Sequence, residues 1–221
     1  MNAIQTTNLT KKFKDFVAVD NLNLSIEQGE LFALLGVNGA GKTTTIKMLS
    51  GLSKPTSGDA ILLGDSIVTQ PFAVKEKINV SPQETAVAPN LTVRENLELI
   101  AGIYGCNYKE ASQKADRMIT DFGMSEVAKK KAKNLSGGWQ RRLIIALALI
   151  YDPQILFLDE PTLGLDVLAR RELWRGIEQL KHKITIILTT HYLEEVEALS
   201  DRHHSRRIKP RQFVFIHSML Y

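Results

Sequence analysis

Short apolar runs alternate along the chain with longer segments in which apolar residues recur at helical spacing. The short runs lie at residues 31–35, 60–63, 155–158 and 185–188. Their length and apolar or β-branched character predict buried strands. Because parallel neighbouring strands must be joined by a long connection, usually a helix, this alternation is typical of an α/β domain. We therefore expect an α/β fold with a substantially parallel sheet.

Between residues 84 and 152 the pattern is helical only. Residues 93–104, 109–122 and 137–151 are predicted to form three consecutive helices, with no convincing strand among them. We therefore expect a helical subdomain over 84–152, inserted into a core domain made of 1–83 and 153–202. Since the chain shows no internal repeat and no low-complexity linker, the two parts are expected to pack as one unit.

Composition indicates an ordinary globular chain. Of 221 residues, 44% are hydrophobic and 24% are charged, which argues against disorder. The single cysteine, Cys106, excludes an intrachain disulfide and favours a reducing compartment. The longest apolar run, at 143–151, is far shorter than the ~20 residues of a membrane span. The first ten residues lack the pattern of a secretory signal.

The net charge of +4 is concentrated at one end. Residues 203–221 hold four basic residues and no acid, so residues 1–202 hold 24 basic and 24 acidic residues. We regard 203–221 as an atypical basic C-terminal tail. A neutral body offers no broad basic surface to a phosphate backbone, so no nucleic-acid partner is expected.

The first candidate site is the glycine-rich segment 36–43, which fits the pattern G-x-x-x-x-G-K-[ST]. It lies between the predicted strand 31–35 and a helix predicted to begin near Lys42, and this placement disfavours an accidental glycine-rich turn. Backbone N–H groups would converge on phosphates, with Lys42 on the β and γ phosphates and the Thr43 hydroxyl on magnesium. The residues expected to bind the nucleotide here are Gly36, Asn38, Gly39, Gly41, Lys42, Thr43 and Thr44.

The second candidate site is the pair of acids, Asp159 and Glu160, that follows the apolar run 155–158. A buried parallel strand delivers such carboxylates to the edge of the sheet where ligands bind. Asp159 is expected to hold magnesium, directly or through water, and Glu160 to polarise the attacking water. The alternative is that both acids end a strand and pair with nearby Lys or Arg residues. The glycine-rich segment upstream favours the catalytic interpretation.

Residues 135–142, Leu-Ser-Gly-Gly-Trp-Gln-Arg-Arg, precede the third predicted helix. Ser136 is expected to cap that helix, and the amides of Gly137 and Gly138 are placed to receive an anion. Taken alone, the segment is better explained as a simple capped helix start. Its position between the other two motifs favours nucleotide binding.

The three motifs, in this order, resemble the nucleotide-binding domain of ABC transporters over residues 1 to about 202. The Leu-Ser-Gly-Gly segment sets that family apart from other P-loop ATPases. The resemblance implies four further site residues: Gln83, which senses magnesium and water and contacts a membrane partner; Asp166; His191, on the γ-phosphate; and Phe13, stacked on adenine. Each of three residues has a structural alternative: Gln83 as a surface amide, His191 as a histidine whose hydrogen bonds are made within the fold, and Phe13 as a core aromatic. Phe16 lies close to Phe13 in the sequence and is a second candidate for the aromatic position.

The resemblance also implies the fold and the reaction. The fold is a P-loop NTPase sheet domain of the ABC ATPase type with the inserted helical subdomain, and the cofactors are ATP and Mg²⁺. Glu160, His191 and Gln83 would be catalytic, and Thr43, Gln83 and Asp159 would hold the metal. ATP would lie between two such domains, a homodimer or another pair of ATPase domains, each completed by Ser136 of its partner.

Hydrolysis is expected to power transport, in the export direction, through a separate multi-span membrane permease. The protein would then lie in the cytoplasm, peripheral on the inner face of the cell membrane. Within the family the motifs most resemble subunits serving bacterial exporters of drugs, sodium or polysaccharide. The alternatives are a soluble ABC ATPase acting on ribosomes or DNA, and a truncated non-functional ABC ATPase.

The chain departs from the family pattern at two places. Trp139 stands where the family usually has Gln, and we expect ATP contact to survive with an altered rate. After residue 202 the glycine-punctuated strands of the family are missing, and we interpret 203–221 as a replaced or frame-shifted end. Residues 213–216 remain a candidate edge strand. His203 and His204 fit a solvated basic tail better than a metal site, because two adjacent histidines lack a ligand set.

Overall fold

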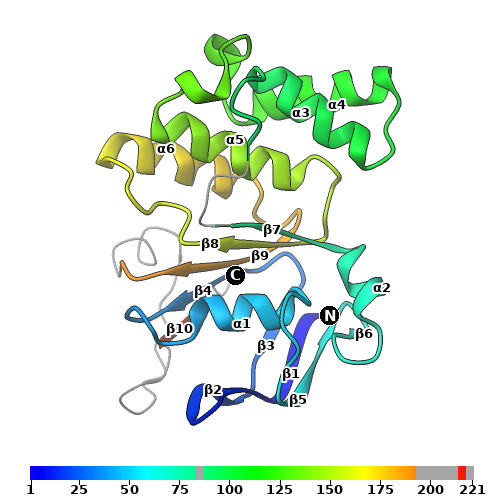
Figure 1. The fold of residues 1–221 in the computed structure, drawn as a ribbon, viewed down its shortest axis with the longest axis vertical. Helices are drawn as coiled ribbons and strands as arrows, with labels where there is room; N and C mark the ends of the chain where they lie inside the picture. Colours follow the sequence, from blue (N-terminus) through cyan, green and yellow to red (C-terminus); the bar gives the residue numbers. More distant parts are fainter. Residues whose placement is uncertain (83–86, 193–213, 218–221) are drawn as a thin grey trace. The chain divides into compact units, whose positions relative to one another are not determined.

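The computed structural model (Figure 1) describes residues 1–82, 87–192 and 214–217. These residues form two compact units. The first holds Met1–Val80, Pro153–Glu160 and the described residues from 180 onward, and the second holds Ser81–Asp152 and Pro161–Gln179. The division differs from the expected one at 81–82 and, more substantially, at 161–179, both of which the sequence placed in the core. Residues 161–179 join the helical unit because α6 (Val167–Glu178) packs against α5 (Gly137–Leu149).

One sheet of the first unit is antiparallel. It consists of β1 (Asn2–Phe13), β2 (Phe16–Leu22), β3 (Ser25–Glu27), β5 (Ser57–Leu62) and β6 (Asp65–Ser66). Strand β1 pairs with β2, β3 and β5. Of this sheet the sequence predicted only the end of β5. Register shifts along β1 break the alternation of buried and exposed residues by which a strand is recognised.

The second sheet of this unit has the strand order β10-β4-β9-β8-β7. Its strands are β4 (Leu31–Leu35), β7 (Ile78–Ser81), β8 (Ile155–Asp159), β9 (Thr185–Thr190) and β10 (Val214–His217). The pairs β4–β9 and β8–β9 are parallel, as expected, and their continuous apolar runs are buried on both faces. At the edge, β10 pairs antiparallel with β4. It lies one residue beyond the candidate strand 213–216, of which residue 213 is outside the described residues.

The second unit is helical in its described part. Besides α5 and α6 it contains α3 (Val93–Ile103), α4 (Tyr108–Asp121) and the short 3₁₀ helices η1 (Ser125–Val127) and η2 (Ala132–Asn134). The ends of α3, α4 and α5 lie within two residues of those predicted. Capping boxes start α3 at Thr92 and α4 at Asn107. Helix α5 contacts the other three helices, and its residues 141–149 are all buried.

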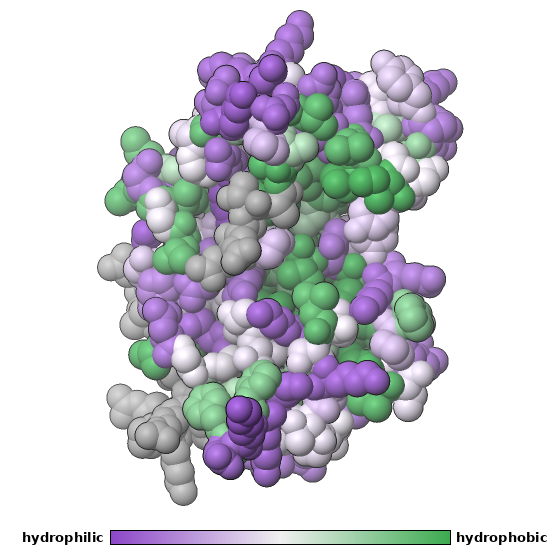
Figure 2. All heavy atoms as spheres, viewed as in Figure 1, coloured by the Kyte–Doolittle hydropathy of each residue, from purple (hydrophilic) through white to green (hydrophobic). Residues whose placement is uncertain are grey.

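Large exposed side chains lie on α3 and at the start of α4, and Figure 2 shows hydrophobic (green) side chains over α3. Leu99 and Ile103 lie one turn apart on α3, and Tyr104 and Tyr108 follow. We call these four residues the α3–α4 apolar patch. In the part of the chain that the structure describes, no helix combines the length and the apolar character needed to cross a membrane.

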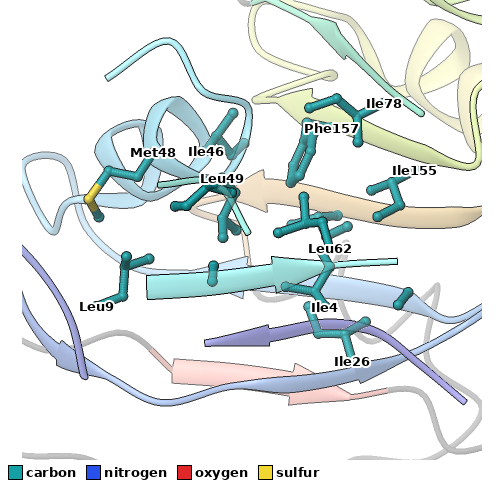
Figure 3. Close-up of a cluster of buried hydrophobic side chains, with 14 of the residues drawn as sticks. Ile4, Leu9, Ile26, Ile46, Met48, Leu49, Leu62, Ile78, Ile155 and Phe157 are labelled. Atoms are coloured by element: carbon teal, nitrogen blue, oxygen red, sulfur yellow. The ribbon is translucent and has the colours of Figure 1, made fainter. Parts of the chain in front are cut away.

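The core of the first unit fixes the two segments that carry the candidate site. Helix α1 (Lys42–Leu49) contacts β2 of one sheet and β8 of the other. The cluster between them (Figure 3) includes Ile4, Leu9, Leu62, Ile46, Met48, Leu49, Ile155 and Phe157. The loop before α1 and the end of β8 are therefore both anchored in one packed interior, which limits how far they can move apart. The remaining helix of this unit is α2 (Pro71–Lys75).

Candidate active site

The glycine-rich segment 36–43 joins the end of β4 to the start of α1, as expected. Gly39 and Gly41 have φ of +81° and +90°, a region that only glycine adopts without strain. Gly41 occupies the N-cap position of α1 and has no side chain to cap the helix. The first N–H groups of α1 therefore have no capping side chain to which they could donate a hydrogen bond, which is the arrangement that attracts an anion.

The Lys42 ammonium group lies inside this loop and is almost fully buried, with 5% of the residue exposed. Its Nζ donates hydrogen bonds to the carbonyl oxygens of Gly36 (2.7 Å) and Val37 (3.3 Å). The same atom lies 3.4 Å from Oε1 of Glu160. The Lys42 ammonium group is thus held between carbonyl oxygens of the loop and the carboxylate of Glu160, which follows β8.

Asp159 ends β8 with a buried carboxylate that accepts two hydroxyl donors on one oxygen. Thr43 Oγ1 donates to Oδ1 at 3.1 Å, and Thr189 Oγ1 donates to the same oxygen at 2.6 Å. Thr43 lies in the first turn of α1 and Thr189 in β9. The structure therefore brings together Thr43 and Asp159, two of the three residues that were expected to hold magnesium.

This donor set fits Mg²⁺. A hydroxyl and a carboxylate are hard oxygen ligands, and Mg²⁺ typically takes only one or two such groups from the protein and the rest from water and phosphates. Thr43 and Asp159 are therefore suited to Mg²⁺ that also contacts a bound phosphate. The third expected ligand, Gln83, lies outside the described residues.

Glu160 lies between a lysine and a histidine. Its Oε2 is 2.8 Å from Nδ1 of His191, and its Oε1 faces Lys42. Its backbone has φ +48°, an uncommon conformation for a residue with a side chain, and its N–H donates to Thr189 Oγ1 at 2.9 Å. The acid does pair with a lysine, as the structural alternative supposed, but that lysine is the one in the glycine-rich loop.

The helical unit holds the candidate residues Ser136, Gly137, Gly138 and Asp166. Ser136 occupies the N-cap position of α5, as expected, but its side chain makes no capping hydrogen bond. Ser136 and Gly137 are exposed. A Cβ on Gly138 would lie 2.8 Å from Cβ of Ala169 in α6. Asp166 caps α6 by accepting a hydrogen bond from the Ala169 N–H at 2.8 Å.

Two arginines of α5 were not singled out from the sequence. Arg142 lies over the ring of Trp139, 4.3 Å from its centroid, and forms an ion pair with Glu172. The bulk of Trp139 is therefore packed against its own helix. Arg141 is buried and donates hydrogen bonds of 2.8 Å to the carbonyl oxygens of Pro82 and Pro161.

Phe13 ends β1 and pairs in register with Phe16 across the β1–β2 turn. Both rings are open to solvent, with exposed fractions of 51% and 58%. The core alternative for Phe13 is therefore wrong, and both phenylalanines are accessible for stacking. The ammonium group of Lys11 lies 5.2 Å from the centroid of the Phe13 ring.

A family model described as ABC transporter matches residues 19–163, more than half of the chain and a range that includes Lys42, Ser136 and Glu160. The chain belongs to the ABC transporter family. The resemblance expected from the motifs is thereby confirmed. A second model, described as an AAA domain, putative AbiEii toxin of a Type IV TA system, matches the shorter range 130–197.

Individual ABC transporter proteins agree with this assignment. The probable multidrug ABC transporter ATP-binding protein YbhF of Escherichia coli is 42% identical over 195 residues, which are 88% of this chain. Those residues are 34% of YbhF, so this chain spans about a third of its length.

Solved structures of ABC proteins share the fold. cbiO1 of Clostridium perfringens, part of the ABC transporter complex cbiONQ, has a TM-score of 0.82 at 26% identity, covering 90% of this chain and 82% of that one. The ATP-binding cassette MJ0796, a dimer in a post-hydrolysis state bound to ADP and Pi, has a TM-score of 0.75 at 27% identity, covering 86% and 89%. The expected P-loop NTPase fold of the ABC ATPase type is confirmed.

Proposed function

We propose that this chain binds ATP with Mg²⁺, hydrolyses it, and so powers export through a separate membrane permease. One observation carries the proposal. Lys42 and Thr43 of the glycine-rich loop lie within hydrogen-bond or ion-pair distance of Asp159 and Glu160, and Glu160 in turn contacts His191. A phosphate-binding cation, an oxygen pair suited to a metal ion and a candidate base are thereby grouped around one point.

The loop residues would grip the triphosphate. The N–H groups around Gly39 and Gly41 bind phosphate oxygens, and Lys42 exchanges its carbonyl contacts for the β and γ phosphates. Bound Mg²⁺, held by Thr43 and Asp159, would offset the negative charge of the phosphates. Phe13, with Phe16 beside it, offers a ring on which adenine can stack.

Glu160 would accept the proton of the attacking water. Its carboxylate is held at Oε2 by His191, so its orientation is set before the water arrives. His191 contacts the γ-phosphate in this proposal and thereby links the base to the presence of the nucleotide. Gln83 is proposed as the remaining contact to magnesium and water.

Pairing of two chains would complete the site. Ser136 has an exposed hydroxyl that is not used to cap α5, and Gly137 beside it is exposed. These groups are suited to a γ-phosphate offered by a second ATPase domain. The dimeric state of MJ0796 bound to ADP and Pi supports this pairing. Asp166 would lie at the same interface.

The partner in the membrane is proposed to be a multi-span permease, which would hold the chain at the inner face of the membrane. The name of YbhF, a probable multidrug ABC transporter ATP-binding protein, supports a drug-like cargo. The α3–α4 apolar patch supports a protein partner, since exposed apolar clusters of this kind mark interaction sites.

Replacement of Glu160 by glutamine tests the proposal. The amide keeps the shape of the side chain but cannot accept a proton, so we expect ATP binding to persist, turnover to fall, and a dimer-sized species to appear on a sizing column with Mg-ATP. Glu178→Gln, an exposed acid on α6, is the control and should behave like the parent chain. Normal turnover in Glu160→Gln would show that the base lies elsewhere. Failure of the parent chain to bind nucleotide would end the proposal altogether.

A further inference from the structure

Thr189 connects the two acids of the candidate site, although no motif includes it. Its side chain is fully buried near the end of β9. The hydroxyl donates to Asp159 Oδ1 at 2.6 Å and accepts the backbone N–H of Glu160 at 2.9 Å. One oxygen atom therefore contacts both the carboxylate proposed to hold magnesium and the backbone of the proposed base.

The register of the sheet produces this contact. Strands β8 and β9 are parallel, and Asp159 is the residue paired with Thr189. Paired residues of neighbouring strands project to the same face of a sheet, so the hydroxyl and the carboxylate meet without any turn or loop between them. The contact is thus built into rigid sheet rather than into a flexible loop.

The two hydroxyl groups that donate to Asp159 Oδ1 would behave differently when a metal ion binds. Thr43 is itself proposed as a metal ligand, so its hydroxyl oxygen would turn to the ion. Thr189 is not proposed as a metal ligand, so its hydroxyl can keep its hydrogen bond to Asp159 Oδ1. A hydrogen bond to a charged group contributes more than one between neutral groups, and it fixes the direction of the carboxylate.

The second hydrogen bond acts on the backbone of Glu160. Its φ of +48° is disfavoured for a residue that has a Cβ, and such conformations persist only where neighbouring groups hold them. The N–H bond to Thr189 is one such restraint. It fixes the point at which the chain leaves β8 and hence the direction in which the Glu160 side chain starts.

We propose that Thr189 is a positioning residue, whose hydroxyl orients the Asp159 carboxylate for Mg²⁺ and holds the Glu160 backbone in its bent conformation. This inference rests on the proposed ATPase function. It adds a residue to that site which contacts neither nucleotide nor metal. Without Thr189 the orientation of the Asp159 carboxylate would be less restricted, so Mg²⁺ would bind more weakly.

Thr189→Val tests the proposal, because it removes the hydroxyl and keeps the branched shape. The control is Thr185→Val on the same strand and the same face, where a buried hydroxyl accepts the Gly29 N–H at 3.0 Å. Both variants lose one buried hydroxyl. Of these two hydroxyl groups, the one on Thr189 contacts Asp159 and Glu160. An effect confined to Thr189→Val therefore cannot come merely from losing a buried threonine hydroxyl in β9.

The primary measurement is the Mg²⁺ concentration that half-saturates binding of a fluorescent ATP analogue, which requires no turnover. Thr189→Val is expected to raise it about tenfold or more, as loss of a charge-assisted hydrogen bond would. Thr185→Val should leave it unchanged, and binding of the analogue in EDTA should be the same in both. Thr189→Ser, which restores the hydroxyl, should recover most of the Mg²⁺ affinity lost in Thr189→Val.

An equal Mg²⁺ dependence in Thr189→Val and Thr185→Val would overturn the proposal, as would failure of serine to restore it. If Thr189→Val does not fold, Thr189→Cys replaces it, since a thiol is a weak donor; a Mg²⁺ requirement equal to that of Thr189→Ser would then refute the proposal. If the parent chain itself neither binds nor hydrolyses Mg-ATP, the proposed function is what fails.

Discussion

Replacing Gly138 by alanine is expected to crowd α5 against α6. The added Cβ would lie 2.8 Å from Cβ of Ala169, whereas carbon atoms in favourable contact are about 3.5–4.0 Å apart. Ala169 has no rotatable side-chain bond with which to move away. One of the helices must therefore shift by roughly 0.7 Å or more, and the packing of the two helices against each other resists such a shift.

Two contributions of opposite sign set the size of the effect. Alanine is favoured over glycine within a helix by up to about 1 kcal/mol, and overpacking costs about 1–3 kcal/mol. Gly102→Ala in α3 measures the helix-propensity contribution alone, because nothing lies within 4 Å of its added Cβ and no overpacking results. The two variants should therefore differ in stability by about 1–3 kcal/mol, which is roughly 2–12 °C in Tm for a chain of this size.

A double-mutant cycle with Ala169→Gly gives the sharpest assay. Removing the methyl group of Ala169 leaves room for the new one at Gly138, so the clash should vanish in the double variant. Thermal melts of the two single variants and the double variant should yield a favourable coupling energy of about 1–3 kcal/mol. Strictly additive effects would show that the two helices do not meet closely at this point and would refute the reasoning.

Two further predictions concern charged groups. Lys42→Ala is expected to weaken binding of a fluorescent ATP analogue about tenfold or more, since each hydrogen bond to a charged phosphate contributes about 1.5–3 kcal/mol. The control is Lys47→Ala, which removes an exposed lysine from the same helix. Equal affinities of the two variants for the analogue would contradict the role of Lys42. Burial alone would raise the pKa of Asp152, but hydrogen bonds from Lys114 and Arg117 hold it below its usual value. Because the folded pKa is depressed, the stability from this acid is present above its unfolded pKa of about 3.9 and is lost as pH falls through the lower folded value. Asp152→Asn should therefore lower Tm at pH 7 by an amount worth about 1 kcal/mol or less, and the difference from the parent chain should narrow towards pH 3; equal Tm values at pH 7 would count against the ion pairs.

The parallel strands were predictable because their physical setting is simple. A strand buried on both faces reads as an unbroken apolar run, and residues 31–35 match β4 at both ends. The antiparallel sheet was not predictable in this way. Strand β1 carries register shifts around Asn8, which has φ +49°, and such bulges interrupt the two-residue period of a half-buried strand.

The residues of the candidate site likewise divide into those that the sequence predicts and those that only the folded structure brings together. Local motifs were enough to predict Lys42, Thr43, Asp159 and Glu160. The glycine-rich turn and the strand that ends in two acids are each formed by consecutive residues, so each can be recognised in the sequence. Thr189 lies 30 residues from Asp159 in the sequence, and only the register of β8 and β9 brings them into contact. Whether the Ser136 side chain caps α5 depends on a rotamer, which no sequence pattern specifies.

Arg141 connects α5 to the residue that follows the proposed base. Its guanidinium group holds the carbonyl oxygens of Pro82 and Pro161 within one compact unit, on the same helix that begins after Ser136. Pro161 directly follows Glu160 in the chain. One hydrogen bond, from Arg141 Nε to the Pro161 carbonyl oxygen, therefore joins α5 to the residue that is peptide-bonded to the proposed base.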